Sequence, residues 1–382
     1  MTSAIVIGAG ASGLATAHAL QAAGIDVRVL ERESYVATPW RQRHPQLRLN
    51  THRLLSSLPG MKMPSRFGAF AARDDMVRYL EDYAAAVAAP IAFDTLVSRI
   101  DRTEAGWRVE TPGNSLRVDH VVVATGVDRV PVTPDWPGMD GFGGEILHAA
   151  HFGDVARYRG RRVLVVGAGN SGTDLLNHLA RVDIGKVWVS VRHGPAMVPT
   201  RFLGCPTQLI SPMLDALPPA AADRVLDLTE WLAFGSLRKH GLPRHWQGGA
   251  TRFAETGTAP AIDNGFVAAL KAGRVTVVPE IDRFEPDGIR LTDGQRIEPD
   301  IVVAATGYRT GLAPMLGHLG VLDEREWPVV HGDQQDTRWP GLWFNGMRPP
   351  LSGTLGAVGK TGQRIAAAIV ASSEPGPHKA SE

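Results

Sequence analysis

The first thirty residues carry two apolar runs that flank a glycine-rich loop. Residues 4–7 are wholly apolar and predict a buried strand, and residues 8–13 read GAGASG. A helical pattern continues to about residue 23, and a second strand is expected over residues 26–30. Strand, glycine loop, helix and strand in this order predict a βαβ unit.

Further along the chain, a helical pattern and several strand patterns precede an Ala-Thr-Gly tripeptide. Apolar residues recur at helical spacing over residues 73–89, so we expect a helix there. Short strands are expected near residues 95–101, 106–110 and 119–123. The tripeptide, residues 124–126, follows the last of these strands directly.

The same order of elements occurs a second time. A strand is expected over residues 162–166, GAGNSG follows at residues 167–172, and a strand over residues 186–191 ends on Arg192. Later strands are expected near residues 274–284, 288–291 and 300–304. A second Ala-Thr-Gly tripeptide, residues 305–307, follows the last of them. An internal repeat of this kind predicts two related nucleotide-binding domains rather than one.

The repeat therefore predicts an α/β chain with two Rossmann-like dinucleotide-binding domains, the second inserted in the first. We expect the first domain over residues 1–157 and 312–382, and the inserted domain over residues 158–311. Residues 195–263 are rich in proline and are the least regular part of the sequence. They predict a helix or two on a variable surface, and residues 195–250 within them are expected to shape the substrate pocket.

The first glycine loop has the spacing of a dinucleotide-binding turn. Gly8 permits a tight turn, Gly10 lets the backbone approach a pyrophosphate, and Gly13 lets the helix pack on the strand. The helix N-terminus offers free N–H groups to phosphate, and Ser12 is expected to bind phosphate as well. Glu31 ends the second strand, where a carboxylate accepts hydrogen bonds from ribose hydroxyls and repels a 2′-phosphate. This loop is therefore expected to bind FAD or NAD.

The second loop repeats the glycine spacing at Gly167, Gly169 and Gly172. Its second strand ends on Arg192, which can pair with a 2′-phosphate, so we expect NADPH at this loop. The alternative is an ordinary solvated arginine at a strand end. Asn170 and Ser171 are expected to contact phosphate or the bound coenzyme. One site with an acidic residue that repels a 2′-phosphate and one with a basic residue that binds it suggest a flavin that accepts hydride from NADPH.

The two tripeptides extend the predicted cofactor sites. The first is expected to approach the FAD, and it comprises Ala124, Thr125 and Gly126. The second is expected near NADP or the domain junction, and it comprises Thr306 and Gly307 together with the following Tyr308. The candidate cofactor-binding residues also include Arg32, Trp40 and Val97.

A final helix is expected over about residues 362–371 or a somewhat longer range, after the segment Ser352–Gly356. An N-terminus of this helix aimed at the flavin would stabilise the negative charge of the reduced flavin.

Composition narrows the range of partners. The chain has 40 Lys+Arg against 39 Asp+Glu, so its charge gives no reason to expect nucleic acid or an acidic membrane. The single cysteine, Cys205, excludes an internal disulfide, a CxxC pair and a Cys-based zinc site, and it fits a reducing cytoplasm. Apolar runs are too short for a transmembrane segment. No third ligand stands near the pair His148 and His151, so no metal site is expected.

Several motifs together carry a family resemblance. The pattern FxGxxxHxxxF occurs just before the second glycine loop, as Phe142, Gly144, His148 and Phe152. Further matching segments are GAGASGLATA (8–17), LRLNTHRLLSSLPGMKMP (47–64), RDDMVRYLEDYA (73–84), KHGLPR (239–244) and TGTAPAID (256–263). Through them the chain resembles the flavin-containing monooxygenases over nearly its whole length, and it is most similar to the YUCCA-type enzymes.

The resemblance implies a class B flavoprotein monooxygenase with FAD and NADPH as cofactors. In such enzymes NADPH reduces FAD, NADP stays bound, and O₂ adds at the flavin C4a position. The resulting peroxide or hydroperoxide transfers one oxygen atom to a small organic substrate. By the same resemblance, Asn50 is the catalytic candidate beside the flavin and the nicotinamide, and His148 is a structural and coupling residue.

The resemblance leaves the substrate class open. A carbonyl compound or 2-oxo acid fits the YUCCA-type likeness, while an amine or thioether fits other members of the family. The alternative function is an NADPH-dependent flavin reductase or oxidase without oxygen insertion. We expect a small molecule and O₂ as partners, and assembly into a homo-oligomer stays open.

Overall fold

The computed structural model describes residues 1–373, and it is a mixed α/β structure built mainly on parallel sheets. The first sheet contains β1 (Ser3–Ile7), β2 (Asp26–Leu30), β3 (Ile91–Ala92), β7 (His120–Val123) and β22 (Leu342–Phe344). These strands pair in parallel in the order β22-β7-β1-β2-β3. The strands expected over residues 26–30 and 119–123 are thereby confirmed to within one residue.

The strands of this sheet are almost wholly apolar because both faces of the sheet are covered. Val6 and Val122 point into one buried cluster, which α1 (Ala11–Ala22) also enters. Ile5 and Val121 point into the cluster on the opposite face. This alternation follows from the two-residue period of a strand.

The second sheet repeats this arrangement. It contains β9 (Glu145–His148), β10 (Arg162–Val166), β11 (Lys186–Ser190), β16 (Val275–Val278) and β20 (Ile301–Ala304). They pair in parallel in the order β16-β11-β10-β20-β9. The helix α4 (Asn170–Leu179) follows β10 as α1 follows β1. The inserted domain was expected to begin at residue 158, but strand β9 lies before that residue. The second sheet therefore includes a strand from the segment that we expected in the first domain.

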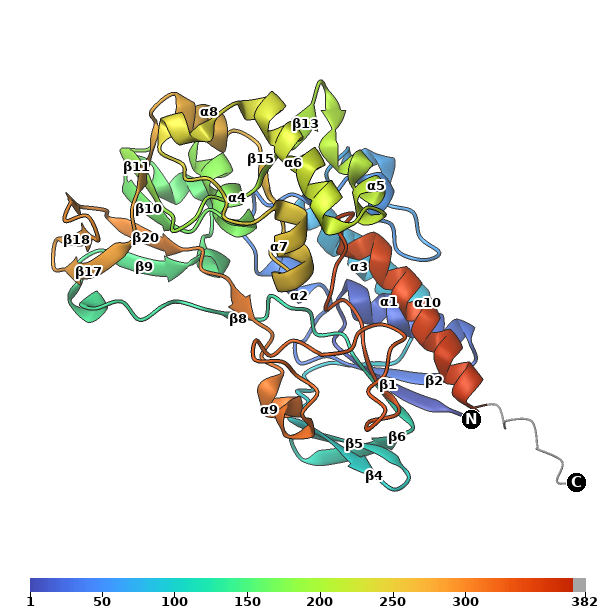
Figure 1. Cartoon of the computed structure of the whole chain (residues 1–382). Helices are drawn as coiled ribbons and strands as arrows, with labels where there is room; N and C mark the ends of the chain where they lie inside the picture. The colour runs from blue at the N-terminus through green and yellow to red at the C-terminus, as the bar shows by residue number, and fades with distance from the viewer. Residues whose placement is uncertain (374–382) are drawn as a thin grey trace, which may run out of the picture.

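Two antiparallel meanders accompany the parallel sheets. One comprises β4 (Arg99–Thr103), β5 (Gly106–Thr111) and β6 (Asn114–Val118), and the other β17 (Ile281–Glu285), β18 (Gly288–Leu291) and β19 (Arg296–Ile297). The expected strand 274–284 is thus wrong as a single element, because β16 and β17 divide it between two sheets. The short pair β8 (Val130–Pro131) and β21 (Tyr308–Arg309) lies between the two parallel sheets (Figure 1).

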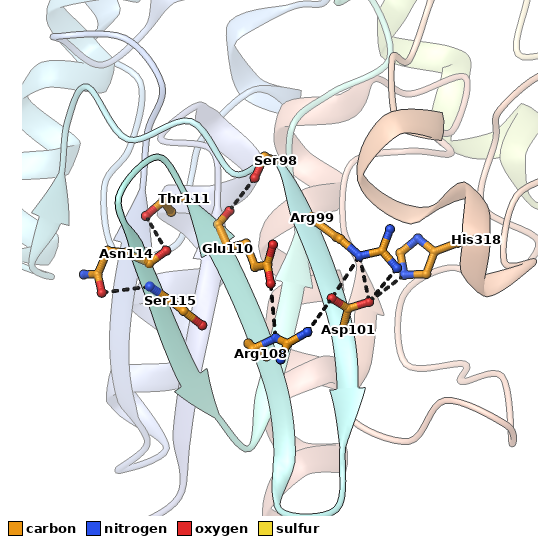
Figure 2. A network of polar contacts seen from close by, with 9 residues as sticks. All are labelled: Ser98, Arg99, Asp101, Arg108, Glu110, Thr111, Asn114, Ser115 and His318. Atoms are coloured by element: carbon orange, nitrogen blue, oxygen red, sulfur yellow. Dashed lines mark hydrogen bonds and ion pairs between the residues drawn. The ribbon is translucent and has the colours of Figure 1, made fainter.

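Asp101 organises the polar surface of the first meander (Figure 2). Its carboxylate pairs with Arg99 and Arg108 on the same meander, and with His318 at 3.0 Å from a distant part of the chain. Burial acts to raise the pKa of Asp101, but hydrogen bonds from the two arginines hold it below its usual value. The contact therefore attaches the segment around residue 318 to the meander.

The proline-rich stretch is more helical than the sequence indicates. It holds four short strands, β12 (Met197–Pro199), β13 (Arg201–Phe202), β14 (Cys205–Pro206) and β15 (Ala261–Asp263). It also holds three helices, α5 (Ser211–Asp215), α6 (Pro219–Phe234) and α7 (Gly249–Thr256). The other helices are α2 (Thr38–Arg41), α3 (Arg73–Val87), α8 (Phe266–Lys271), α9 (Ala313–Leu316) and α10 (Thr354–Ser373). Within residues 1–373, no helix combines the length and apolar character needed to cross a membrane.

The helix α10 begins eight residues earlier than expected, at Thr354. Gly356, Gly359 and Gly362 recur at every third position of the added turns, and glycine lowers helix propensity. A Cβ on Gly356 would lie 2.4 Å from the carbonyl oxygen of Leu55, and one on Gly362 would lie 3.1 Å from the Cα of Thr16. Gly356 therefore lets α10 approach the segment at Leu55, and Gly362 lets it pack closely along α1, where Figure 1 shows the two helices side by side.

Asn345 joins the first sheet to both of these helices. Its side chain is fully buried, and Nδ2 donates to Thr16 Oγ1 at 2.8 Å and to the carbonyl oxygen of Val358 at 3.0 Å. Its backbone N–H donates to the carbonyl oxygen of Val123. A buried amide with such partners fixes the positions of three elements at once.

We predict that Asn345→Ala lowers the free energy of unfolding by about 1–3 kcal/mol, because the Val358 carbonyl loses its side-chain partner in a buried site. Urea denaturation followed by circular dichroism measures the change. The matched control is Gln295→Ala at an exposed turn, which should stay within about 0.5 kcal/mol of the wild type. An Asn345→Ala variant as stable as the control would contradict this assignment.

Candidate functional site

One cavity of about 1590 Å³ takes lining residues from both glycine loops. The residues that follow the carboxyl ends of β1, β7, β10 and β20 all contribute to its wall. Ligands of open α/β sheets bind at this edge, beyond the carboxyl ends of the parallel strands. The cavity is therefore the candidate functional site.

The first glycine loop is shaped by close backbone approaches. Gly8 has a φ of 103°, and a Cβ there would lie 2.9 Å from the carbonyl oxygen of Ala124. A Cβ on Gly13 would lie 1.8 Å from the carbonyl oxygen of Gly8. Side chains are excluded at both positions, so α1 starts directly at the loop and its N-terminal N–H groups face the cavity.

Glu31 is attached to this loop from the neighbouring strand. Its side chain is buried, and Oε2 accepts a hydrogen bond of 2.6 Å from the N–H of Ala9. Oε1 accepts a hydrogen bond of 3.1 Å from the N–H of Glu33. The carboxylate also borders the cavity, so its remaining lone pairs can accept hydrogen bonds from a ligand.

The second glycine loop has the same internal geometry as the first. Gly167 has a φ of 98°, and a Cβ there would lie 2.7 Å from the carbonyl oxygen of Ala305. A Cβ on Gly172 would lie 1.9 Å from the carbonyl oxygen of Gly167. The N-terminus of α4 therefore meets the cavity as that of α1 does, and both can bind phosphate.

The second loop has arginines nearby, whereas the first loop has the carboxylate of Glu31. Arg192 follows β11, borders the cavity and keeps 76% of its side chain exposed. Its Nε lies 3.7 Å from Glu280 Oε1, which is a weak surface pair. Arg252 on α7 also borders the cavity, and the sequence analysis did not single it out. Burial lowers the pKa of Arg252, and the charge of Arg192 lowers it further.

His148 lies behind the cavity wall and connects β9 to the second tripeptide. Its Nδ1 accepts a hydrogen bond from the N–H of Ala150, so Nε2 carries the proton and donates to the carbonyl oxygen of Gly307 at 3.1 Å. Its ring meets the Tyr308 ring edge-on, with the centroids 4.9 Å apart. Burial lowers the pKa of His148, and the Gly307 contact only partly opposes this. A neutral, hydrogen-bonded histidine fits a structural role.

Asn50 is exposed and borders the cavity beside the segment that leads into α10. The neighbouring Thr51 is buried, and its Oγ1 lies 2.8 Å from Ser56 Oγ. A Cβ on Gly353 would lie 2.4 Å from Thr51 Cγ2, so these two segments touch. These contacts fix the backbone next to Asn50, whose uncharged amide borders the cavity.

The cavity gathers nearly all the residues that the sequence predicted for the site. From the first half of the chain its wall includes Gly8, Gly10, Ser12, Glu31, Arg32, Trp40, Asn50, Val97, Ala124, Thr125 and Gly126. From the second half it includes Gly167, Gly169, Asn170, Ser171, Arg192, Thr306, Gly307 and Tyr308. Gly13 and Gly172 are not in the wall, and their closest neighbours are the loop carbonyls.

A cofactor fits this wall on two structural grounds. Both loops contain glycines at which a Cβ would clash with backbone atoms, and both loops lead into the N-terminus of a helix, which can bind phosphate. In addition, the buried Thr125 Oγ1 has no hydrogen-bond partner within residues 1–373. An unsatisfied buried hydroxyl is costly unless a ligand completes it.

The proline-rich stretch supplies a part of the wall that the sequence did not resolve into residues. This part is largely apolar and includes Val198, Ile210, Leu214, Leu226 and Ile262, with Thr207 and Gln208 among them. Asp215 accepts hydrogen bonds from the backbone N–H groups of Leu351 and Ser352, at 2.8 and 3.1 Å. These bonds connect the apolar wall to the segment beside Asn50.

One side-chain group in the described part of the chain has metal-ligating atoms within 4.8 Å of one another, namely His44, Asp174 and His178. His44 Nε2 lies 2.9 Å from Asp174 Oδ2, which is a hydrogen-bonding distance. Burial acts to raise the pKa of Asp174, but hydrogen bonds from both histidines lower it to about 2. We interpret the group as a polar link between the segment after α2 and the helix α4.

Comparisons with known proteins give consistent results. A family model described as pyridine nucleotide-disulphide oxidoreductase matches residues 5–198. The indole-3-pyruvate monooxygenase YUCCA1 of Oryza sativa subsp. japonica is 34% identical over 85% of this chain and 80% of its own. Because the chain has one cysteine, the family match cannot reflect a disulfide within the chain.

Solved structures agree with these sequence matches. A flavin-containing monooxygenase from Stenotrophomonas maltophilia is 25% identical, with a TM-score of 0.72 over 98% of this chain and all of that one. An oxidized steroid monooxygenase bound to NADP has the same fold, with a TM-score of 0.74, 21% identity and coverage of 97% and 85%.

We predict that Glu31→Gln weakens FAD binding by about 10- to 100-fold, because a charged hydrogen-bond acceptor for the ribose becomes neutral. Flavin fluorescence during ultrafiltration measures the free cofactor. The matched control is Glu33→Gln, which removes a neighbouring carboxylate that pairs with Arg32 at 2.9 Å. Equal FAD affinity in the two variants would count against a role for Glu31.

Proposed function

The chain belongs to the flavin-containing monooxygenase family, whose cofactors are FAD and NADP(H), and on that premise we propose that it is an NADPH-consuming monooxygenase. In this proposal one oxygen atom of O₂ is transferred to a small organic substrate. The observation that carries the proposal is that two glycine loops of opposite charge environment open into one cavity.

We assign a Rossmann-like domain and one cofactor to each parallel sheet. The FAD domain comprises residues 1–157 without β9, together with residues 312–373, and the NADPH domain comprises residues 158–311 with β9 added. Residues 374–382, also expected in the FAD domain, lie outside the described residues. The buried carboxylate of Glu31 supports FAD at the first loop, since it would repel a 2′-phosphate. The exposed Arg192 supports NADPH at the second loop, since it can bind that phosphate.

The protein's own groups bind and orient, while bound FAD supplies hydride acceptance and oxygen activation. The N-termini of α1 and α4 hold the two pyrophosphates. Asn50 offers a neutral amide that donates and accepts hydrogen bonds without adding charge beside the reacting atoms. The apolar part of the wall, which the proline-rich stretch supplies, limits the access of water to the reacting atoms.

The substrate is proposed from the relatives together with the cavity wall. The curated relative named above acts on indole-3-pyruvate by its name, so a 2-oxo acid or another carbonyl compound is the leading class. Amines and thioethers are the second class, because the family resemblance covers both chemistries. The apolar side chains of the wall, such as Leu214 and Leu226, favour a substrate with a hydrophobic body.

The proposal predicts that turnover under ¹⁸O₂ places one labelled atom in each product molecule and consumes one NADPH per product. Mass spectrometry of the product, together with NADPH absorbance, measures both quantities. Candidate 2-oxo acids, ketones, amines and thioethers are screened in parallel. Stoichiometric H₂O₂ with unlabelled organic compounds in every case would instead establish a reductase or oxidase.

We predict that Arg192→Ala raises the KM for NADPH by about tenfold and changes the KM for NADH by less than about twofold, because only NADPH carries the 2′-phosphate. Steady-state kinetics with both coenzymes provides the test. Arg159→Ala alters another exposed arginine that is outside the cavity wall and should behave as the wild type. If Arg192→Ala affects NADPH and NADH equally, the assignment of this arginine is wrong.

A further inference from the structure

Arg252 is a cation in the cavity wall without a neutralising partner. It lies on α7 in the proline-rich stretch, far in sequence from the second glycine loop. Among residues 1–373 its guanidinium forms no hydrogen bond or ion pair, although the side chain is partly buried. A partly buried charge without a partner is unfavourable, so the position indicates an anionic ligand.

The neighbouring charge makes this indication stronger. Arg192 borders the same cavity and is near enough to Arg252 to lower its pKa, in addition to the effect of burial. In the described part of the chain, the carboxylate that pairs with Arg192 is that of Glu280, which is 3.7 Å away and about half exposed. Two arginines that repel each other across a cavity would both be stabilised by a doubly charged anion between them.

The fold holds Arg252 in place through Asp223 of α6. Asp223 Oδ1 accepts hydrogen bonds from the N–H groups of Ala250 and Thr251, at 2.7 and 3.1 Å, in the first turn of α7. A Cβ on Gly248 would lie 2.1 Å from Asp223 Cγ, so the two helices approach closely at this point. These contacts fix the first turn of α7, up to the residue directly before Arg252. Its place on the wall is therefore set by secondary structure and not by a free loop.

We propose that Arg252 is a second specificity-determining residue for the 2′-phosphate of NADPH and acts together with Arg192. The proposal rests on the proposed function, because it takes NADPH as the ligand of the second glycine loop. The phosphate attracts both guanidinium groups and also removes their mutual repulsion. NADH lacks this phosphate, so the two guanidinium groups would still repel each other when NADH is bound. The attraction by the phosphate and the relief of this repulsion therefore both favour NADPH.

Calorimetry of the FAD-loaded enzyme with two coenzyme fragments tests the proposal. The fragments are 2′-phospho-ADP-ribose and ADP-ribose, which lack the nicotinamide and cannot react. We expect Arg252→Ala to weaken binding of the phosphorylated fragment by about tenfold and of ADP-ribose by less than about twofold. Arg252→Lys should retain a part of the preference, because it keeps the charge but not the planar fork.

The matched control is Arg244→Ala, which removes an arginine of the same stretch that is exposed, outside the wall and 3.7 Å from Asp227. It should bind both fragments as the wild type does, and thermal melting should show all variants folded. The role of Arg252 would be overturned if Arg252→Ala weakened binding of both fragments equally. It would also be overturned if Arg252→Ala bound both fragments as the wild type does while Arg192→Ala lost the preference for the phosphorylated fragment. A wild-type enzyme that binds both fragments equally would instead overturn the assignment of NADPH to this loop.

Discussion

The structure depends on one backbone constraint that occurs twice. At Gly8 and again at Gly167, a glycine with positive φ passes within contact distance of the carbonyl that follows the neighbouring strand, at Ala124 and Ala305. Any side chain at these glycines would push the two strand ends apart. Each close approach shapes one glycine loop. The N-termini of α1 and α4 follow these loops and border the same cavity, and the remaining features of the site are arranged around these two points.

Charge then distinguishes two loops that have the same shape. The first loop has the buried carboxylate of Glu31, held by the N–H of Ala9. The second has the exposed Arg192, and Arg252 on α7 borders the same cavity. In the proposed function, equal backbone geometry with opposite charge selects two different nucleotides in one cavity, which is what hydride transfer between two cofactors requires.

The repeated elements were predictable because they follow simple periodic patterns. Both glycine loops, the strands 162–166 and 288–291 and the helix after Arg73 are found where the sequence indicates. The start of α10 was missed because Gly356, Gly359 and Gly362 read as helix-weakening, whereas here they permit close packing. Arg252 and the apolar wall were missed because residues 195–263 have no regular period, and their positions depend on tertiary contacts such as that of Asp223.

The central claim is that this single cavity holds FAD and NADP at once, each on its own glycine loop. A crystal structure of the enzyme soaked with both cofactors tests it most directly. The account predicts the FAD adenosine ribose at Glu31 and the NADP 2′-phosphate at Arg192, with the two reactive rings facing each other near Asn50. Density for FAD on the second loop, or for one nucleotide spanning both loops, would contradict it.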